Sequence, residues 1–153
     1  VRKEFSRLQR FHQPFCIIIL DIDHFKLVND LYGHLTGDQV LNLIAQTMKK
    51  TLRGLDTIAR FGGEEFSVLL PQTGLDEGKK AAERLRSAVA NLTIPIGETT
   101  ITVTISLGVT CATKNDSATV PLELETILGL ADRALYIAKN KGRNCVGFSE
   151  EIL

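Results

Sequence analysis

A pair of glycines between two apolar runs, within residues 56–70, constrains the fold of this chain more than any other feature. Gly62 and Gly63 predict a tight two-residue loop between two strands, because glycine alone takes positive φ without steric cost. Glu64 and Glu65 follow directly. Glycines let a phosphate approach the backbone closely, and adjacent carboxylates are the ligands that a hard cation prefers. The segment therefore predicts a hairpin with a cation or phosphate site at its tip.

Length and composition indicate one ordinary globular domain over residues 1–153. Apolar residues make up 44% of the chain and charged residues 24%, which is typical of a protein with a sizeable core. The 18 basic and 18 acidic side chains cancel, so there is no basic field to attract nucleic acid, and no such partner is predicted. The longest apolar run, residues 15–20, is far too short to cross a bilayer, and no signal peptide is visible. We therefore expect a cytoplasmic domain.

The cysteines predict unpaired thiols. Cys16, Cys111 and Cys145 are odd in number and far apart, and each lies in an apolar or strand-like context. Buried free thiols in a reducing compartment are the interpretation that this pattern favours.

Hydrophobic periodicity predicts alternating helices and strands. Besides the hairpin, we expect helices at 2–12, 37–52, 75–90 and 122–140, and strands at 15–20, 99–110 and 145–148. The continuous apolar run 15–20 is typical of a central strand buried on both faces, whereas the strict alternation in 99–110 is typical of a half-buried strand. Thr36 is the expected N-cap of the second helix. The β-α-β-β-α-β core predicts an α/β (α+β) domain with a ferredoxin-like, mixed five-stranded sheet flanked by helices.

Acidic residues are expected to gather at one edge of this sheet. Asp21 ends the first central strand and Asp23 follows it, so either could simply cap the next helix. The first strand and the hairpin are expected neighbours, however. Three or four carboxylates, from the set Asp21, Asp23, Glu64 and Glu65, would then lie close together. Such a group would repel itself without a cation. Mg²⁺ fits, and the Ile22 carbonyl could add a ligand.

Several other side chains could contact a nucleotide, although each also has an ordinary structural explanation. Lys26 begins a short helix, where it could meet phosphate or be a solvated surface charge. Lys139 and Arg143 share one face of a helix end, where they could bind phosphate or complement the helix dipole. Asn29 and Asp38 could bind the paired N–H groups of guanine, or cap helices.

Taken together, the motifs are similar to those of a known family. They are Asp21-Ile-Asp-His-Phe-Lys26, Asn29-Asp30, Gly33-His34, Gly37-Asp38, Arg60 to Phe66, Ser106 to Val109 and Ala131 to Asn144. In this order and spacing the chain resembles the GGDEF domain of diguanylate cyclases, in a GGEEF variant. The resemblance implies a palm-like fold, as in polymerases and nucleotide cyclases. It also implies condensation of two GTP into cyclic di-GMP and two pyrophosphates by a homodimer.

The resemblance also implies roles for individual residues. Asp21, the Ile22 carbonyl and Glu64 correspond to metal ligands for two Mg²⁺ per active site, with Mn²⁺ able to substitute, and Glu65 corresponds to a companion acid. The remaining matches are Gly62 and Gly63 for the α-phosphate, Phe25, Lys26, Lys139 and Arg143 for the β- and γ-phosphates, and Asn29 and Asp38 for guanine. Whether Glu64, Glu65 or water accepts the 3′-hydroxyl proton is left open.

A second site is implied upstream of the hairpin. Arg53 and Asp56 match the family's Arg-x-x-Asp motif for inhibition by cyclic di-GMP, and Arg84 corresponds to a further arginine of that site. Arginine can fork onto guanine or phosphate, and a carboxylate can accept guanine N–H bonds. The simpler alternative is a surface ion pair of little energetic value.

The family segment that normally precedes the first helix is absent from residues 1–153. We therefore expect a domain cut from a longer sensor protein, with any membrane anchor in the upstream part. Besides an active cyclase, two alternatives are a catalytically silent receptor for cyclic di-GMP or GTP and a relaxed cyclase that makes mixed products. The intact hairpin argues against the first and Asp38 against the second.

Overall fold

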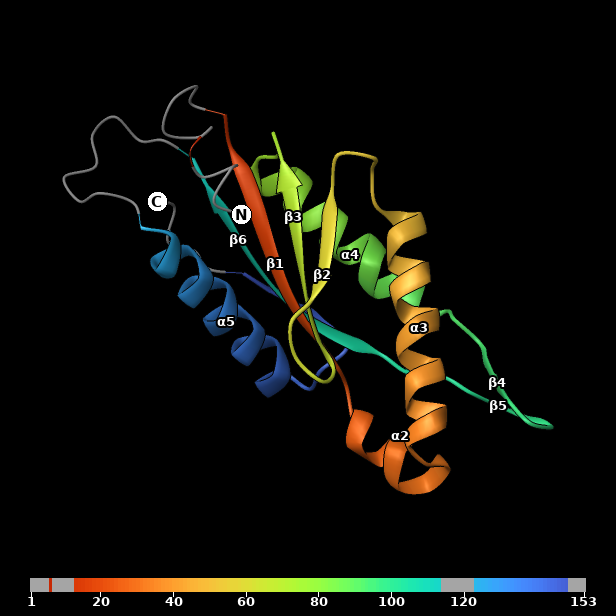
Figure 1. The fold of residues 1–153 in the computed structure, drawn as a ribbon. Helices are drawn as coiled ribbons and strands as arrows, with labels where there is room; N and C mark the ends of the chain where they lie inside the picture. The colour runs from red at the N-terminus through yellow and green to blue at the C-terminus, as the bar shows by residue number, and fades with distance from the viewer. Residues whose placement is uncertain (1–5, 7–12, 114–122, 149–153) are drawn as a thin grey trace.

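A mixed five-stranded sheet with helices on both faces forms the body of the protein (Figure 1). The computed structural model describes residue 6 and residues 13–113 and 123–148. The strands are β1 (Phe15–Ile22), β2 (Thr57–Arg60), β3 (Glu65–Pro71), β4 (Ile94–Ile96), β5 (Thr99–Ile101), β6 (Ile105–Ala112) and β7 (Val146–Phe148). The helices are α2 (Phe25–Tyr32), α3 (His34–Thr51), α4 (Leu75–Ala90) and α5 (Leu124–Asn140). Apart from Ser6, the helix predicted at 2–12 lies outside the described residues.

The sheet has the order that a ferredoxin-like domain requires. Its strands run β2-β3-β1-β6-β7, with β6 and β7 parallel and the other pairs antiparallel. The register places Asp21 opposite Glu65, so the predicted neighbourhood of the first strand and the hairpin is confirmed. The predicted fold class is confirmed as well.

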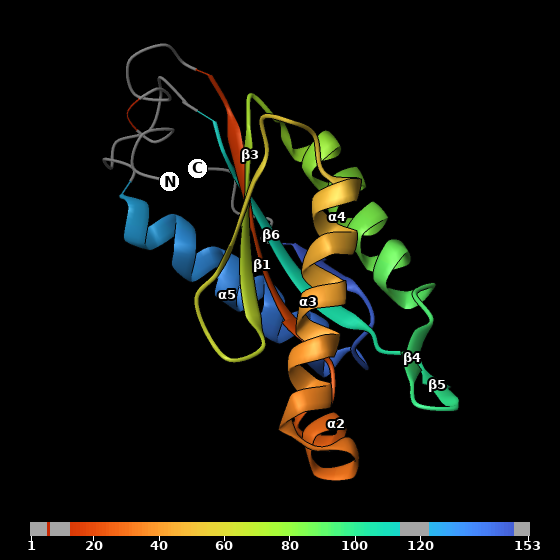
Figure 2. The same ribbon diagram turned by 45° about the vertical axis from the view of Figure 1, so that its right-hand side comes forward.

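Both faces of β1 are buried, as the apolar run predicts. Cys16, Ile18 and Leu20 pack on the side of α3 and α4, whereas Ile17 and Ile19 pack on the side of α5. Figure 2 shows α5 on one face of the sheet and α3 and α4 on the other. Full burial of one such side chain stabilises the fold by about 1.5–3 kcal/mol, so this strand anchors the core.

Two glycines allow α5 to lie directly on the sheet. A Cβ at Gly108 of β6 would meet backbone atoms of Ala131 and Leu135, and a Cβ at Gly147 of β7 would meet the Ala134 carbonyl. Any side chain at either position would push the helix outward. The close approach fixes where the last turn of α5, with Lys139, lies relative to the end of β1.

Three details of the sequence prediction are wrong. Helix α3 begins at His34, with Gly33 at its N-cap, so Thr36 lies inside the helix. The strand expected at 99–110 is interrupted at residues 102–104: its first part pairs with β4 in a separate hairpin, and its second part is β6. Strand β6 is buried along its whole length because α4 and α5 cover its two faces, which alternation alone could not reveal.

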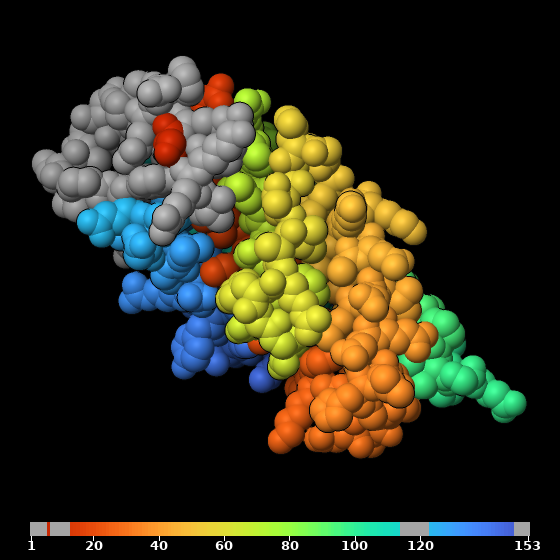
Figure 3. Space-filling model, in the orientation of Figure 1, coloured from red at the N-terminus to blue at the C-terminus, as the bar shows by residue number. Residues whose placement is uncertain are grey.

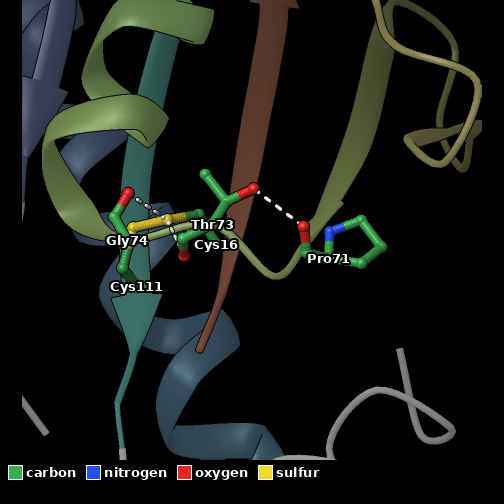
Figure 4. The surroundings of a disulfide bond; sticks show 5 residues. All are labelled: Cys16, Pro71, Thr73, Gly74 and Cys111. Atoms are coloured by element: carbon green, nitrogen blue, oxygen red, sulfur yellow. Dashed lines mark hydrogen bonds between the residues drawn. A yellow bond between two sulfur atoms is a disulfide. The ribbon is translucent and has the colours of Figure 1, made fainter. Parts of the chain in front are cut away.

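The prediction of three free thiols is also wrong. Cys16 of β1 and Cys111 of β6 are directly opposite one another and form a disulfide, and Cys145 is free. Figure 4 shows the bond beside the loop that leads into α4, where the Cys16 Sγ lies 3.3 Å from the carbonyl oxygens of Thr73 and Gly74. The pairing joins residues 95 apart in sequence, and their register is set by the sheet.

None of the helices in the described part of the chain is long and apolar enough to cross a membrane.

Candidate active site

A polar pocket of about 190 Å³ lies at the C-terminal end of β1. Four separate segments line it: the end of β1, the start of α2, the β2–β3 loop, and the end of α5 with the turn after it. Most of the predicted metal and phosphate residues meet there, namely Asp21, Ile22, Phe25, Lys26, Glu64, Lys139 and Arg143. In Figure 3 the yellow-green loop lies between the orange α2 and the blue α5, as this convergence requires.

Asp21 is buried at the base of the pocket and is only partly satisfied. Its Oδ2 pairs with the Lys139 ammonium, whereas its Oδ1 is buried without a hydrogen-bond partner. A buried carboxylate oxygen without a partner is costly, because it has lost water and gained nothing in return. The free oxygen is therefore a ready ligand for a cation.

Glu64 experiences the same local excess of negative charge. Burial raises the pKa of its carboxyl group, the neighbouring Asp21 raises it further, and the positive charge of Lys139 opposes both effects. A proton or a cation would relieve this repulsion. The donor set of Asp21 and Glu64 thus fits a hard divalent ion, which prefers carboxylate oxygens.

The expected convergence of carboxylates is confirmed for three residues, because Asp21, Asp23 and Glu64 line one pocket. Within the described residues there is no group of three or more histidine, cysteine, aspartate or glutamate side chains placed to hold a metal. Glu65 does not line the pocket, although its charge contributes to raising the pKa of Glu64, and the Asp23 carboxylate is already bonded to Thr104 and Ser106. Of the three, Asp21 and Glu64 are therefore the carboxylates that remain available to a cation.

Asp23 has a structural role that the sequence did not reveal. Its carboxylate accepts hydrogen bonds from the hydroxyls of Thr104 and Ser106, at 2.7 and 2.6 Å, and from the Asn144 backbone N–H at 3.0 Å. The simple alternative that Asp21 or Asp23 caps α2 is wrong, because the N-cap is His24 and no side chain caps the helix.

The hairpin loop is longer than predicted, and its glycines act differently. Register pairing ends at Arg60 opposite Phe66, and the Phe61 N–H donates to the Glu65 carbonyl at 3.2 Å. Neither Gly62 nor Gly63 has a positive φ. A Cβ at Gly62 would lie 2.5 Å from the Glu65 carboxylate, so this glycine provides space.

Arg60 holds the loop in shape, which sequence reasoning missed. Its guanidinium donates to the carbonyl oxygens of Gly62 and Gly63 at 2.7–3.2 Å. Three hydrogen bonds, from the Nε and Nη2 donors to the two loop carbonyls, restrict the loop that carries Glu64. An arginine two residues before a glycine pair was the sequence signal that could have predicted this role.

The two predicted guanine contacts lie outside this pocket. Asn29 is half-buried on α2, and Asp38 is exposed in α3. A Cβ at Gly37, the residue before Asp38, would overlap the Asn29 carboxamide, so that carboxamide lies against α3 at this point. The structure therefore brings the two segments that carry these residues together.

The Arg53–Asp56 motif forms a closed turn after α3. The Arg53 N–H donates to Asp56 Oδ2 at 2.8 Å, and the Asp56 N–H donates to the Arg53 carbonyl at 3.0 Å. In the described part of the chain, the exposed guanidinium groups of Arg53 and Arg84 have no ion pair. The alternative of an Arg53–Asp56 side-chain ion pair is therefore wrong.

Comparison with known proteins decides the family. A family profile described as "Diguanylate cyclase, GGDEF domain" matches residues 1–145. The chain belongs to the GGDEF diguanylate cyclase family. Diguanylate cyclase DgcP of Pseudomonas aeruginosa is 43% identical to it over 144 residues, which cover 94% of this chain and 21% of that protein. Diguanylate cyclase VdcA of Vibrio cholerae is 41% identical over 137 residues, which cover 88% of this chain and 39% of that protein.

Solved structures agree with this assignment. The active GGEEF domain of a diguanylate cyclase from Vibrio cholerae superimposes with a TM-score of 0.85 at 32% identity, covering 97% of this chain and 91% of that one. The GGDEF domain of DgcB from Caulobacter crescentus, solved with c-di-GMP, gives a TM-score of 0.85 at 30% identity, covering 97% and 85%. The curated relatives are much longer, and this GGDEF domain spans between a fifth and two fifths of the two named above.

Proposed function

We propose that this GGDEF domain condenses two GTP molecules into cyclic di-GMP and two pyrophosphates, as the output domain of a longer sensor protein in the cytoplasm. One observation carries the proposal: carboxylates and cations from four segments line a single pocket at the end of β1. A nucleoside triphosphate with a divalent ion needs this combination, because the carboxylates hold the ion and the cations meet the phosphates.

In this proposal Asp21, the Ile22 carbonyl and Glu64 hold Mg²⁺, two ions per active site, with Mn²⁺ able to substitute. The buried Oδ1 of Asp21 and the raised pKa of Glu64 support a cation between them. When bound, the metal ions neutralise phosphate charge and favour the ionised attacking hydroxyl. Glu65 supports the metal site from the hairpin as a companion acid.

The other residues bind and orient GTP. Lys26, Lys139 and Arg143 contact the β- and γ-phosphates, as does the start of α2 at Phe25. Gly62 and Gly63 leave room for the α-phosphate against the hairpin. Asn29 and Asp38 bind guanine, because a carboxylate accepts two N–H bonds and guanine offers such a pair.

Two chains act together in this mechanism. Each chain binds one GTP, and the 3′-hydroxyl of one nucleotide attacks the α-phosphorus of the other while pyrophosphate leaves. The proton of the attacking 3′-hydroxyl passes to Glu64, Glu65 or water. A homodimer is therefore required, and the rate is expected to rise steeply with protein concentration.

The test is to incubate the protein with GTP and Mg²⁺ at high protein concentration and to separate the products by chromatography. We expect cyclic di-GMP and pyrophosphate, no product with EDTA, and no mixed product when ATP is added. Absence of cyclic di-GMP across the accessible concentration range would overturn the proposal. A mixed GMP–AMP product would contradict the role of Asp38 alone.

We further propose that cyclic di-GMP inhibits the enzyme by binding Arg53, Asp56 and Arg84. The closed turn with an unpaired Arg53 guanidinium supports such a site, because it exposes a fork of donors beside a fixed carboxylate. Arg53→Ala should relieve product inhibition and leave the initial rate unchanged, whereas Arg133→Ala, an exposed arginine on α5, should change neither. The same turn favours the alternative function of a silent receptor. That alternative gains if Glu64→Ala leaves the output of the protein unchanged while cyclic di-GMP still binds.

A further inference from the structure

The turn between α5 and β7 has a backbone that needs support. Gly142, Arg143 and Asn144 have φ angles of 111°, 65° and 45°. Asparagine tolerates this left-handed region, but for arginine it is unfavourable, and such a conformation persists only where the surroundings hold it. Arg143 lines the pocket at the end of β1. The groups that hold the turn therefore decide where Arg143 points.

Asp23 holds the backbone of this turn. Its buried carboxylate, only 6% exposed, accepts the Asn144 N–H at 3.0 Å. The same carboxylate accepts hydrogen bonds from the hydroxyls of Thr104, just before β6, and Ser106 in β6, which fix its orientation. Hydrogen bonds to a buried carboxylate are among the stronger ones in proteins. Asp23 thus connects the end of β1, β6 and the turn.

Arg86 of α4 holds the side chain of Asn144, the residue whose backbone N–H is bonded to Asp23. Its Nη1 donates to Asn144 Oδ1 at 2.8 Å. Glu83, one turn earlier on α4, accepts the other donors of Arg86 at 2.6–3.0 Å, and this bonding lowers the pKa of the Glu83 carboxyl group. The guanidinium is therefore oriented by its own helix and presents its remaining donor to the turn.

We propose that Asp23 and Arg86 are positioning residues for the phosphate contact of Arg143. One holds Asn144 through its backbone amide and the other through its carboxamide, so the turn is set before a nucleotide arrives. Setting a cation in place in advance lowers the entropy lost on binding. The inference rests on the proposed function, since it assumes that Arg143 binds the β- or γ-phosphate of GTP.

The first experiment compares Arg86→Gln with the matched control Lys80→Gln, an exposed cation elsewhere on α4. Binding of GTP, as its 3′-deoxy analogue that cannot condense, and of GMP, each with Mg²⁺, is measured by calorimetry. We expect Arg86→Gln to weaken GTP binding about tenfold, as for loss of one hydrogen bond to a charged group. GMP binding should not change, because GMP lacks the β- and γ-phosphates. The control should bind both as the wild type does.

A double-mutant cycle with Arg143→Ala separates positioning from general destabilisation. If Arg86 acts through Arg143, adding Arg86→Gln to Arg143→Ala should cause no further loss of GTP affinity. Equal losses for GTP and GMP, or fully additive losses in the cycle, would overturn the inference. Unchanged GTP binding by Arg86→Gln would also overturn it while leaving the proposed function intact.

Amide hydrogen exchange tests the same inference without a nucleotide. In the ligand-free protein the Asn144 amide should be protected, and Asp23→Asn should accelerate its exchange at least about tenfold while core amides of β1 keep their protection. Rapid exchange at Asn144 in the wild type would overturn the inference. If wild-type protein fails to bind GTP, the proposed function fails, and this measurement still decides whether Asp23 holds the turn.

Discussion

The N-terminal end of β1 is packed and cross-linked, whereas its C-terminal end carries charge that is only partly compensated. At the first end Phe15 and Cys16 are 1% and 0% exposed, and Cys16 is bonded to Cys111. At the other end the Asp21 Oδ1 lacks a partner and the pKa of Glu64 is raised. One strand therefore joins a stabilising region to a functional one.

The difference shows how a site for metal and phosphate is tolerated. Leaving a buried polar group unsatisfied costs about 1–3 kcal/mol, and burying one large apolar side chain contributes a similar amount in the opposite direction. The packed end can offset the cost of the charged end. Four changes at the two ends test this comparison.

The largest effect is expected for Asp21→Asn at the charged end. Asparagine keeps the shape of the side chain but loses the charge that a divalent cation needs. Turnover of GTP to cyclic di-GMP should fall by about 10²–10³-fold or more, while the urea midpoint of unfolding stays the same or rises. The matched control is Asp76→Asn on the exposed first turn of α4, which should leave turnover unchanged. Turnover within twofold of the wild type for Asp21→Asn would contradict the assignment.

Reduction of the Cys16–Cys111 disulfide should lower the free energy of unfolding through the packed end of β1 and leave the pocket at the other end unchanged. The bond closes a loop of 95 residues, and such cross-links stabilise the folded state by about 2–4 kcal/mol, mainly by restricting the unfolded chain. Urea unfolding with and without reductant measures the loss, and turnover should stay within about twofold, since the pocket lies at the far end of β1.

Two further measurements check this prediction. The double variant Cys16→Ala/Cys111→Ala should unfold at the same urea concentration with and without reductant. Alkylation of the unfolded, unreduced protein should label Cys145 alone. Labelling of all three cysteines under that condition would show that the disulfide is absent.

Gly78→Ala should also destabilise the packed end. A Cβ at this position of α4 would lie 2.6 Å from the Cys16 Sγ and 3.0 Å from the Cys111 Sγ. Overpacking of this kind costs about 1–3 kcal/mol, which urea unfolding resolves. Gly129→Ala is the control, because its Cβ on α5 meets no atom within 4 Å. It should stabilise the protein by about 0.5–1 kcal/mol, since alanine favours helix. Equal changes for both variants would contradict the packing argument.

The smallest effect is expected for Glu64→Gln, which should slightly stabilise the domain at neutral pH. Because the folded protein raises the pKa of Glu64, the wild type binds this proton more tightly when folded. The wild type therefore loses stability relative to the variant as pH rises from the ordinary pKa of glutamate to the raised pKa of Glu64 in the folded protein. Above that pKa the difference in the free energy of unfolding between the two proteins is constant. Thermal unfolding from pH 4 to 8 measures the gap. A wild type more stable than the variant at neutral pH would show that burial and the neighbouring Asp21 do not raise the pKa of Glu64 in the folded protein.

Local patterns predicted most elements well. The apolar run at the start of β1, the stripes of α4 and α5 and the short last strand all follow from periodicity within one segment. The prediction failed where neighbours decide. Strand β6 alternates in sequence like a half-exposed strand but is covered on both faces. The hairpin of residues 94–101 was missed for a different reason, because its local signal, the two-residue loop Gly97-Glu98 with Gly97 at a φ of 58°, was not used.

The site divides in the same way. Sequence alone determined which residue types stand at the end of β1, at the hairpin and at the end of α5, because each motif is local and its spacing is fixed by the chain. Tertiary structure decided that Asp21, Glu64 and Lys139 share one pocket while Asp23 turns toward Asn144. It also decided that Cys16 pairs with Cys111. Those contacts depend on strand register and on the close approach of α5 to the sheet, and the packing of distant segments sets both.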